Sequence, residues 1–384
     1  QRVLLNQGYR ISVDGVAGKV TQGYLYDDEV CKNLLNIKYG DTGARVRKLQ
    51  NRLYDLNFSK EYGDGKFSRQ TEKQLMNLQN VLLSKGFKPI QVNGIADEDT
   101  RKALYEADLS EFGIIAPEFF DENDISKLNR DYIYSKNAIV MDVDGNILFE
   151  KDANTRAYPA SLTKMMTLLL SLESGKADEI IHFNEKIMKT PNGSSLVPFS
   201  LDEYVSKRDV QFGLMLKSGN EAANALAVNH SRTFTKFVSA MNEKAKKLHM
   251  KHSLFANAHG FHNEKHYSTA KDMALLALEL IKNEEAKSIF SSKSHELSKT
   301  NIHKPRSIKN SAEIMQESSN FFYENCKGIK TGYTSKAGNC FACLAEKDGK
   351  QLIVVVLGAR TRNMSWIDTK RLCEFGFYKL ENAK

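Results

Sequence analysis

Residues 1–105 carry three copies of one short pattern, and this repetition constrains the fold more than any other feature of the sequence. In each copy a Gln is followed 14 or 15 residues later by a Gly and, six residues further on, by a Thr. The Gly completes an Asp-Gly or Asn-Gly pair, which favours a tight turn with positive φ, and Thr caps helices through its hydroxyl. Each unit is therefore predicted to be a helix, a turn and the start of another helix, too small to bury a core alone. The three sets are Gln1, Gly15 and Thr21; Gln50, Gly65 and Thr71; and Gln79, Gly94 and Thr100.

The second and third units share one predicted helix, residues 71–83, and a Gly-Asp-Thr-Gly stretch at residues 40–43 comes before them. Together they predict a three-helix domain. This pattern resembles the peptidoglycan-binding family of small three-helix modules, through its Gly-Asp-x-Gly opening, its Leu-Gln pair and its two turn-plus-Thr units. We assign residues 37–108 to such a module and residues 1–36 to the C-terminal half of a truncated preceding copy. A helical spacer with similar turns is the alternative.

The composition changes after the repeats. Residues 109–130 are acidic and include a Pro, which indicates a linker or entry segment, and residues 131–384 are assigned to the next domain. Two hairpins are predicted there, around the turns 143–146 and 347–350, because strand-like runs flank an Asp-Gly pair in each. A mostly helical region lies between them, and a final amphipathic helix is expected over about 365–380. Strands near both ends with helices between them predict an antiparallel sheet covered by helices, an α+β fold.

Charge and hydropathy exclude two broad functional classes. Lys and Arg total 55 against 47 Asp and Glu, a net charge of +8, but the Lys residues are spread along the chain with no run of five or more. Nucleic-acid-binding proteins usually cluster their basic residues on one surface, so no nucleic-acid partner is expected. No apolar run reaches about 18 residues, so no transmembrane helix is expected within this sequence. No secretory signal peptide is recognisable at its start.

Ser161 and Lys164 form the sharpest chemical motif, in the stretch Tyr-Pro-Ala-Ser-Leu-Thr-Lys-Met-Met. The Pro suits the start of a helix, and a Ser that opens this helix shares one face with the Lys three residues later. A Lys that is partly stripped of water and close to another cation can lose its proton and take one from the Ser hydroxyl. A second Ser-x-x-Lys, from Ser268 to Lys271, is predicted to be structural, because Thr269 and the Asp three residues later form a helix-capping arrangement.

Two further triplets follow the Ser-x-x-Lys motif in order. Ser218-Gly-Asn220 precedes a run of good helix formers, and Lys330-Thr-Gly lies just before the terminal hairpin. Each triplet alone is weak evidence, but the ordered set is typical of penicillin-binding proteins and class A β-lactamases. Residues 131–384 resemble the low-molecular-mass penicillin-binding proteins, the serine-type D-alanyl-D-alanine carboxypeptidases. The resemblance extends to residues 158–167, 257–261, 266–274 and 330–338.

The resemblance implies a function and a role for each motif residue. The protein would remove the terminal D-alanine from peptidoglycan stem peptides without a metal or organic cofactor, and penicillins would acylate it as mimics of the D-Ala-D-Ala end. A wall substrate and a wall-binding module imply an extracytoplasmic location, secreted or associated with the cell surface. Ser161 would be the nucleophile, Lys164 its general base, and Ser218 the relay of a proton to the leaving D-alanine. The substrate would be held by Asn220, Lys330, Thr331, Gly332 and Tyr333, with the backbone N–H groups of Ser161 and Tyr333 forming the oxyanion hole.

Four alternatives stay open at this point. A D,D-endopeptidase of the same clan would carry the same motifs. A β-lactamase needs an additional carboxylate base for rapid deacylation, and no such Glu is recognisable between Ser218 and Lys330. A zinc peptidase is suggested by five His within residues 249–266, but there is no His-Glu-x-x-His, and the pair Cys340 and Cys343 is predicted to be buried strand because no second pair completes a zinc site. A non-enzymatic wall-binding protein would not need all three motifs intact.

Overall fold

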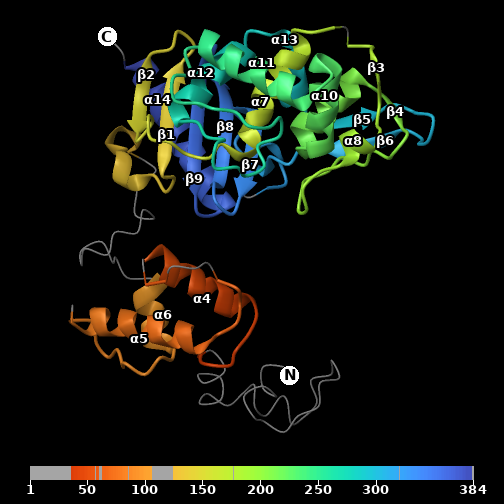
Figure 1. Cartoon of the computed structure of the whole chain (residues 1–384). Helices are drawn as coiled ribbons and strands as arrows, with labels where there is room; N and C mark the ends of the chain where they lie inside the picture. Colours follow the sequence, from red (N-terminus) through yellow and green to blue (C-terminus); the bar gives the residue numbers. More distant parts are fainter. Residues whose placement is uncertain are drawn as a thin grey trace. The chain divides into compact units, whose positions relative to one another are not determined.

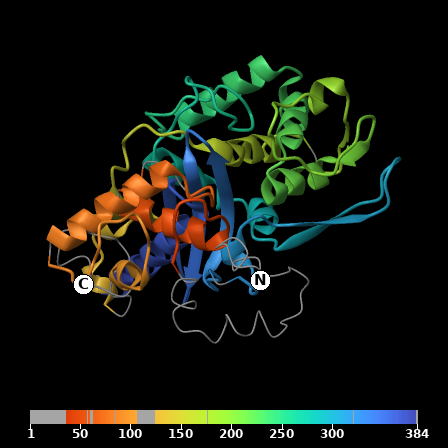
Figure 2. The same cartoon turned by 90° about the horizontal axis from the view of Figure 1, so that it is seen from below.

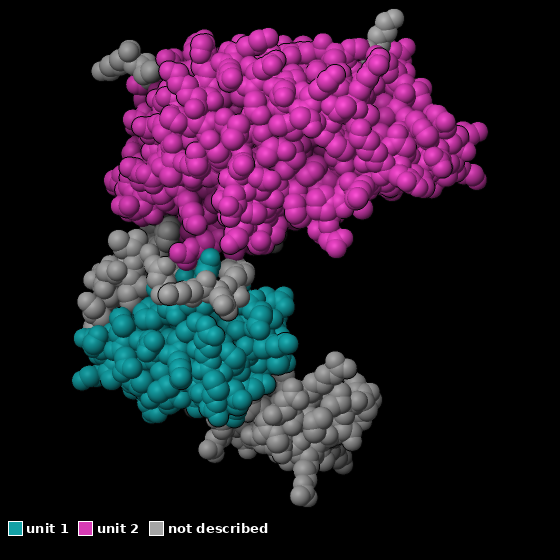
Figure 3. Space-filling view, in the orientation of Figure 1, with its two compact units in different colours: residues 1–119 teal, residues 120–384 magenta. Residues whose placement is uncertain are grey.

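The computed structural model describes residues 36–56, 58–59, 63–84, 86–105, 124–175, 177–319 and 321–382 (Figure 1). The chain divides into two compact units, Gln1–Phe119 and Phe120–Lys384, which are coloured separately in Figure 3. The half-module expected for residues 1–36 lies outside the described residues, except for its last residue. Most of the expected linker, residues 109–130, lies outside them as well.

The described part of the first unit is helical, as the repeat predicts. Its helices are α4 (Ala44–Asp55), α5 (Arg69–Ser84) and α6 (Glu98–Tyr105). Leucines at helical spacing on these helices point to a common centre, so the three amphipathic faces bury one another. The core leucines are Leu49, Leu53, Leu75, Leu78, Leu82 and Leu104.

The repeated Gln explains why the pattern recurs. Gln50 Nε2 donates to Thr71 Oγ1 at 3.1 Å, and its Oε1 accepts from Gly65 N at 2.8 Å. One buried amide therefore joins the tight turn to the first turn of the next helix. The same two bonds recur one unit later, from Gln79 to Thr100 Oγ1 at 3.1 Å and from Gly94 N to Gln79 at 3.0 Å.

A five-stranded antiparallel sheet forms the centre of the second unit, in the order β2-β1-β9-β8-β7 (Figure 1). Side chains alternate between its faces, so each central strand contributes to two cores. Val140 and Val354 pack on one face with Trp366 of the last helix, whereas Ile139 and Val355 face the helical layer. The α+β fold is confirmed. The strands are β1 (Asn137–Asp142), β2 (Ile147–Lys151), β7 (Cys326–Thr334), β8 (Gly338–Lys347) and β9 (Lys350–Ala359).

Helix α7 (Lys164–Leu172) is the buried centre of the helical layer, with eight of its nine residues inaccessible. The helices around it are α8 (Glu185–Met188), α9 (Lys207–Phe212), the π-helical η6 (Gly213–Lys217), α10 (Asn220–Ser231), α11 (Phe234–Lys247), α12 (Ala270–Leu280) and α13 (Glu284–Phe290). Two small antiparallel sheets pair β3 (Ile180–His182) with β4 (Tyr204–Ser206) and β5 (Ser294–Leu297) with β6 (Arg306–Lys309). The second of these extends away from the body of the unit (Figure 2).

Several local predictions from the sequence are confirmed in this unit. Thr269 Oγ1 accepts from Asp272 N at 3.0 Å and caps α12, which makes the second Ser-x-x-Lys structural. Cys340 and Cys343 are buried in β8. The final helix, α14 (Arg362–Glu381), begins three residues before the expected start, because Thr361 caps it by accepting from Met364 N. No described helix is long and apolar enough to cross a membrane.

Candidate active site

Ser161 lies in a sharp turn that ends in the buried helix α7. The sequence predicted that Ser161 opens this helix, but it belongs to the 3₁₀ turn η5 (Ala160–Thr163), and α7 begins at Lys164. Ala160, just before Ser161, has a φ of +47°, a conformation that L-residues rarely adopt. The helical turn from Ser161 to Lys164 is preserved, so both side chains still point the same way.

Three groups surround the Lys164 amine. Its Nζ lies 3.1 Å from Ser161 Oγ, 2.8 Å from Asn220 Oδ1 and 2.8 Å from the carbonyl oxygen of His259. The amide oxygen and the carbonyl can only accept hydrogen bonds, so they take two of the amine hydrogens. In a neutral amine, the remaining lone pair then faces the Ser161 hydroxyl. The arrangement is that of a base in contact with the proton it removes.

Electrostatics favour this neutral form. Lys164 is completely buried, and burial together with the nearby Lys330 cation holds its pKa well below the ordinary value, with Glu221 acting in the opposite direction. Burial also lowers the pKa of Lys330 to about 7, with a further contribution from Arg362. Among the described residues neither lysine forms an ion pair with a carboxylate, so burial makes the charged form of Lys164 unfavourable.

The Ser218-Gly-Asn220 motif follows a π-helical turn and begins with a left-handed residue. Ser218 has a φ of +61°, and its Oγ is buried with no hydrogen-bond partner among the described residues. Asn220 opens α10 and is held on both sides, since its Oδ1 accepts from Lys164 and its Nδ2 donates to Ser194 Oγ at 2.8 Å. A Cβ on Gly219 would overlap the side chain of Val197, so a glycine is required between the two.

Strand β7 brings the third motif against the nucleophile turn. A Cβ on Gly332 would lie 3.1 Å from Ser161 N, so glycine allows the strand to approach the Ser161 amide. Thr331 Oγ1 is 3.0 Å from Ser311 Oγ and 3.5 Å from Lys330 Nζ. Tyr333 is 60% exposed, which places it at the rim of this site. All eight residues expected from the sequence therefore lie on three segments that meet near Ser161, namely η5 with α7, the junction of η6 with α10, and β7.

Two positioning groups are missing from the sequence prediction. His266 Nδ1 accepts from Ala256 N, so its Nε2 carries the hydrogen and donates to Thr163 Oγ1 at 2.8 Å. Thr163 in turn donates to the Ala160 carbonyl at 2.8 Å, which fixes the strained turn before Ser161. Burial lowers the pKa of His266 to about 4, so this relay holds at neutral pH. The sequence contains His266 in a recognisable motif, but it does not indicate that this side chain contacts Thr163 of η5, which is distant in the sequence.

Glu221 is the second such group. It is fully buried beside Asn220, its Oε1 accepts from Val197 N at 2.5 Å, and its Oε2 has no partner among the described residues. Burial raises its pKa to about 7. The carboxyl therefore links the start of α10 to the segment that holds Ser194.

Replacing Glu221 by Gln should change the pH dependence of stability. The pKa of Glu221 in the folded protein, about 7, exceeds its pKa in the unfolded chain. Such a carboxyl stabilises the folded protein fully only at pH values below the unfolded-state pKa, and this stabilisation is lost as the pH rises through the folded-state pKa. Between pH 5 and pH 8, the free energy of unfolding of E221Q should gain about 2 kcal/mol relative to the original protein. Urea unfolding of both proteins at pH 5 and at pH 8 measures this difference in the free energy of unfolding. The exposed Glu264→Gln is the matched control, and equal pH dependence in both variants would show that Glu221 is not destabilised by burial.

The histidines of residues 249–266 do not converge. Among the described residues, no group of three or more His, Cys, Asp or Glu side chains is placed to hold a metal ion. His259 and His266 are buried, and burial lowers the pKa of His259 to about 3. These two side chains support the nucleophile turn and the Lys164 loop instead.

Comparison with known proteins gives a consistent result. Residues 124–361 match the model of the D-alanyl-D-alanine carboxypeptidase family, and residues 42–104 match a peptidoglycan-binding domain. The D-alanyl-D-alanine carboxypeptidase DacF of Bacillus subtilis is 32% identical over 274 residues, which are 69% of this chain and 68% of the relative. DacC of Escherichia coli is 33% identical over 255 residues, 64% of this chain and 62% of the relative. The chain thus spans about two thirds of the length of these relatives.

A solved structure extends the comparison to the fold. The DD-transpeptidase of Streptomyces K15 superposes with a TM-score of 0.61 and 25% sequence identity, covering 65% of this chain and all of the other.

Proposed function

Because this chain belongs to the D-alanyl-D-alanine carboxypeptidase family, we propose that it removes the terminal D-alanine from peptidoglycan stem peptides through an acyl-enzyme on Ser161. The observation that carries this is the Lys164 amine, buried, held by two acceptors and facing the Ser161 hydroxyl at 3.1 Å. A serine activated by a lysine needs no metal or organic cofactor.

The acylation step uses the residues around Lys164. Lys164 takes the Ser161 proton while Oγ bonds to the carbonyl carbon between the two D-alanines, and the N–H groups of Ser161 and Tyr333 stabilise the oxyanion. The carbon–nitrogen bond then breaks, and the proton passes from Lys164 through Ser218 to the departing amine. In deacylation, water attacks the ester as Lys164 takes a proton from it, and the proton returns to Ser161 when the shortened peptide leaves.

The β7 residues would recognise the terminal carboxylate. Thr331 offers a hydroxyl and Lys330 a nearby positive charge, and Gly332 lets the strand lie close to the Ser161 amide. Asn220, held by Lys164 and Ser194, would bind the amide of the acyl side. The free edge of β7 is thus matched to an extended peptide that ends in a carboxylate.

Incubation with a fluorescent penicillin, followed by mass spectrometry of the labelled peptide, tests this proposal together with an assay for released D-alanine. A lasting adduct on Ser161 and release of D-alanine from a stem pentapeptide are expected. Rapid hydrolysis of penicillin without an adduct would favour a β-lactamase, and cleavage of cross-linked dimers without D-alanine release would favour an endopeptidase. No reaction of folded protein with either compound would reject a serine mechanism.

The N-terminal module is proposed to bind the wall, which would place the protein outside the cytoplasm. Its core is formed within residues 37–104 and shares no residue with the cores of the catalytic unit. Removing residues 1–119 should therefore reduce co-sedimentation with insoluble peptidoglycan at least about tenfold, while hydrolysis of a soluble pentapeptide continues at a similar rate. Unchanged sedimentation of a truncated protein with full peptidase activity would contradict this role.

A further inference from the structure

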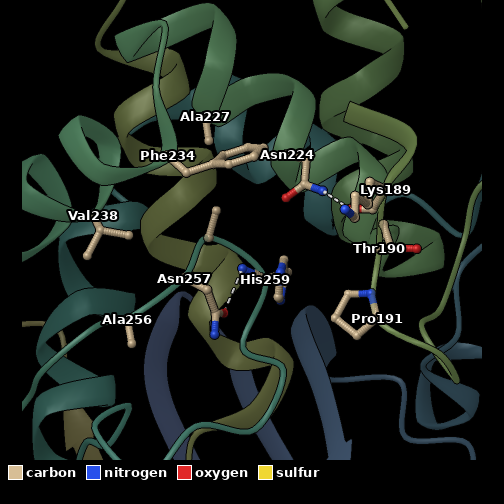
Figure 4. A pocket seen from close by; sticks show the side chains of 11 residues that line it. Lys189, Thr190, Pro191, Asn224, Ala227, Phe234, Val238, Ala256, Asn257 and His259 are labelled. Atoms are coloured by element: carbon tan, nitrogen blue, oxygen red, sulfur yellow. Dashed lines mark hydrogen bonds between the residues drawn. The ribbon is translucent and has the colours of Figure 1, made fainter. Parts of the chain in front are cut away.

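A pocket of about 470 Å³ lies beside His259, whose carbonyl contacts Lys164, and is not used by the mechanism above (Figure 4). Its walls are mostly apolar and come from α10, α11 and the loop that leads to His259. They are formed by Ala227, Phe234, Val238, Ala256 and Ala258. Five polar residues are placed among them, namely Lys189, Thr190, Asn224, Asn257 and His259. A concave apolar site with a few convergent polar groups is the usual form of a ligand subsite.

The pocket shares its walls with the catalytic centre. Asn220 and Asn224 are one turn apart on α10, so one faces Lys164 and the other faces the pocket on the same side of the helix. His259 lines the pocket, and its carbonyl accepts from the Lys164 amine at 2.8 Å. None of the residues that line the pocket belongs to β7, the strand proposed to bind the substrate carboxylate. The pocket therefore lies on a different side of Lys164 from that strand.

The polar groups in the pocket differ in charge and in hydrogen-bonding direction. Asn224 Nδ2 donates to the carbonyls of Ile187 and Lys189 at 3.1 and 3.3 Å, so its oxygen is left as an acceptor. The His259 ring is neutral, since burial lowers its pKa to about 3, and its Nδ1 accepts from Phe261 N, which leaves Nε2–H as a donor. Lys189 is an exposed cation at the wall. An aliphatic chain that ends in both an amine and a carboxylate matches this set.

We propose that this pocket receives the side chain of the amino acid that precedes D-alanyl-D-alanine, and that it selects a diamino dicarboxylic acid of the diaminopimelate type over lysine. The inference rests on the proposed function, because it requires the acyl side of the peptide, which Asn220 would hold, to lie next to this pocket. The methylene groups contact the apolar walls, the distal amine meets the Asn224 oxygen, and the distal carboxylate meets Lys189. A lysine side chain lacks that carboxylate and brings only a cation toward Lys189.

Three peptides that end in D-Ala-D-Ala test the inference. They carry meso-diaminopimelate, lysine or glycine before the two D-alanines, and kcat/KM is measured from released D-alanine. The diaminopimelate peptide should be cleaved at least tenfold better than the lysine peptide. Lys189→Ala should reduce that preference to about twofold by slowing only the first peptide, whereas Lys236→Ala, an exposed cation of α11 outside the lining, should leave it unchanged.

A second variant tests the apolar walls. Val238 is only half-buried on α11, so Val238→Phe can fill the pocket without disturbing the core. It should lower kcat/KM at least tenfold for both long side chains and leave the glycine peptide unchanged. Equal rates for the diaminopimelate and lysine peptides, identical effects of the two lysine variants, or an equal loss on the glycine peptide would each overturn the inference. If no peptide releases D-alanine and penicillin gives no adduct, the proposed function has failed and the pocket assignment fails with it.

Discussion

Replacing Ser161 by Ala is expected to abolish labelling by a fluorescent penicillin and to lower the rate of D-alanine release at least about 10⁴-fold. The Ser161 oxygen is the only hydroxyl in contact with the Lys164 amine among the described hydrogen bonds, so no neighbouring group takes its place. Thermal unfolding should change little, because Ser161 is only half-buried and the removed atom fills no cavity. Gel fluorescence and a coupled assay for D-alanine measure the two losses.

The chain supplies a matched control in its second Ser-x-x-Lys. Ser268 is buried, and its Oγ lies 2.7 Å from Ser253 Oγ; none of its described hydrogen bonds involves Lys164. Ser268→Ala should keep full labelling and D-alanine release, at a cost of about 1 kcal/mol in the free energy of unfolding. Labelling that persists in the Ser161 variant would mean that the nucleophile has been misassigned.

Patterns that depend on neighbours in sequence were predictable. The repeated Gln, Gly and Thr predicted the three helices of the small module, because one buried amide joins a turn to the helix that follows. The two Asp-Gly turns predicted the hairpins β1-β2 and β8-β9, of which β1, β8 and β9 are central strands of the sheet and β2 is an edge strand. The ordered triplets predicted which segments meet at Ser161, since Asn220 contacts Lys164 and Gly332 lies against the Ser161 amide.

Contacts between distant backbone segments were not predictable. The third acceptor around Lys164 is a carbonyl, that of His259, and a carbonyl is carried by every residue. Glu221 follows Asn220 directly, but its burial against Val197 N depends on the path of a loop 24 residues upstream. The 3₁₀ turn at Ser161 was missed for the same reason, since the strained φ of Ala160 is held by Thr163 and His266 rather than by local propensity.

The loop at Gly260 gives the second large effect. Gly260 has a φ of +81°, and a Cβ there would overlap the carbonyl oxygen of Ala160 and lie 2.8 Å from Thr163 Oγ1. Both groups belong to the turn that presents Ser161, and neither can move without breaking the bond between them. The same loop carries the His259 carbonyl that holds Lys164, so the positions of Ser161 and Lys164 both depend on the absence of a side chain at residue 260.

Gly260→Ala should therefore lower the free energy of unfolding by about 3 kcal/mol or more, from positive φ and overpacking combined. The protein that still folds should react with penicillin at least about 100-fold more slowly, because small displacements of a nucleophile from its base are costly. Gly349→Ala isolates the backbone cost, since Gly349 has a φ of +74° with no atom within 4 Å of its Cβ position. That control should lose about 1–2 kcal/mol and keep its full acylation rate. Equal behaviour of the two variants in urea unfolding and in penicillin labelling would contradict the close packing of this loop on the nucleophile turn.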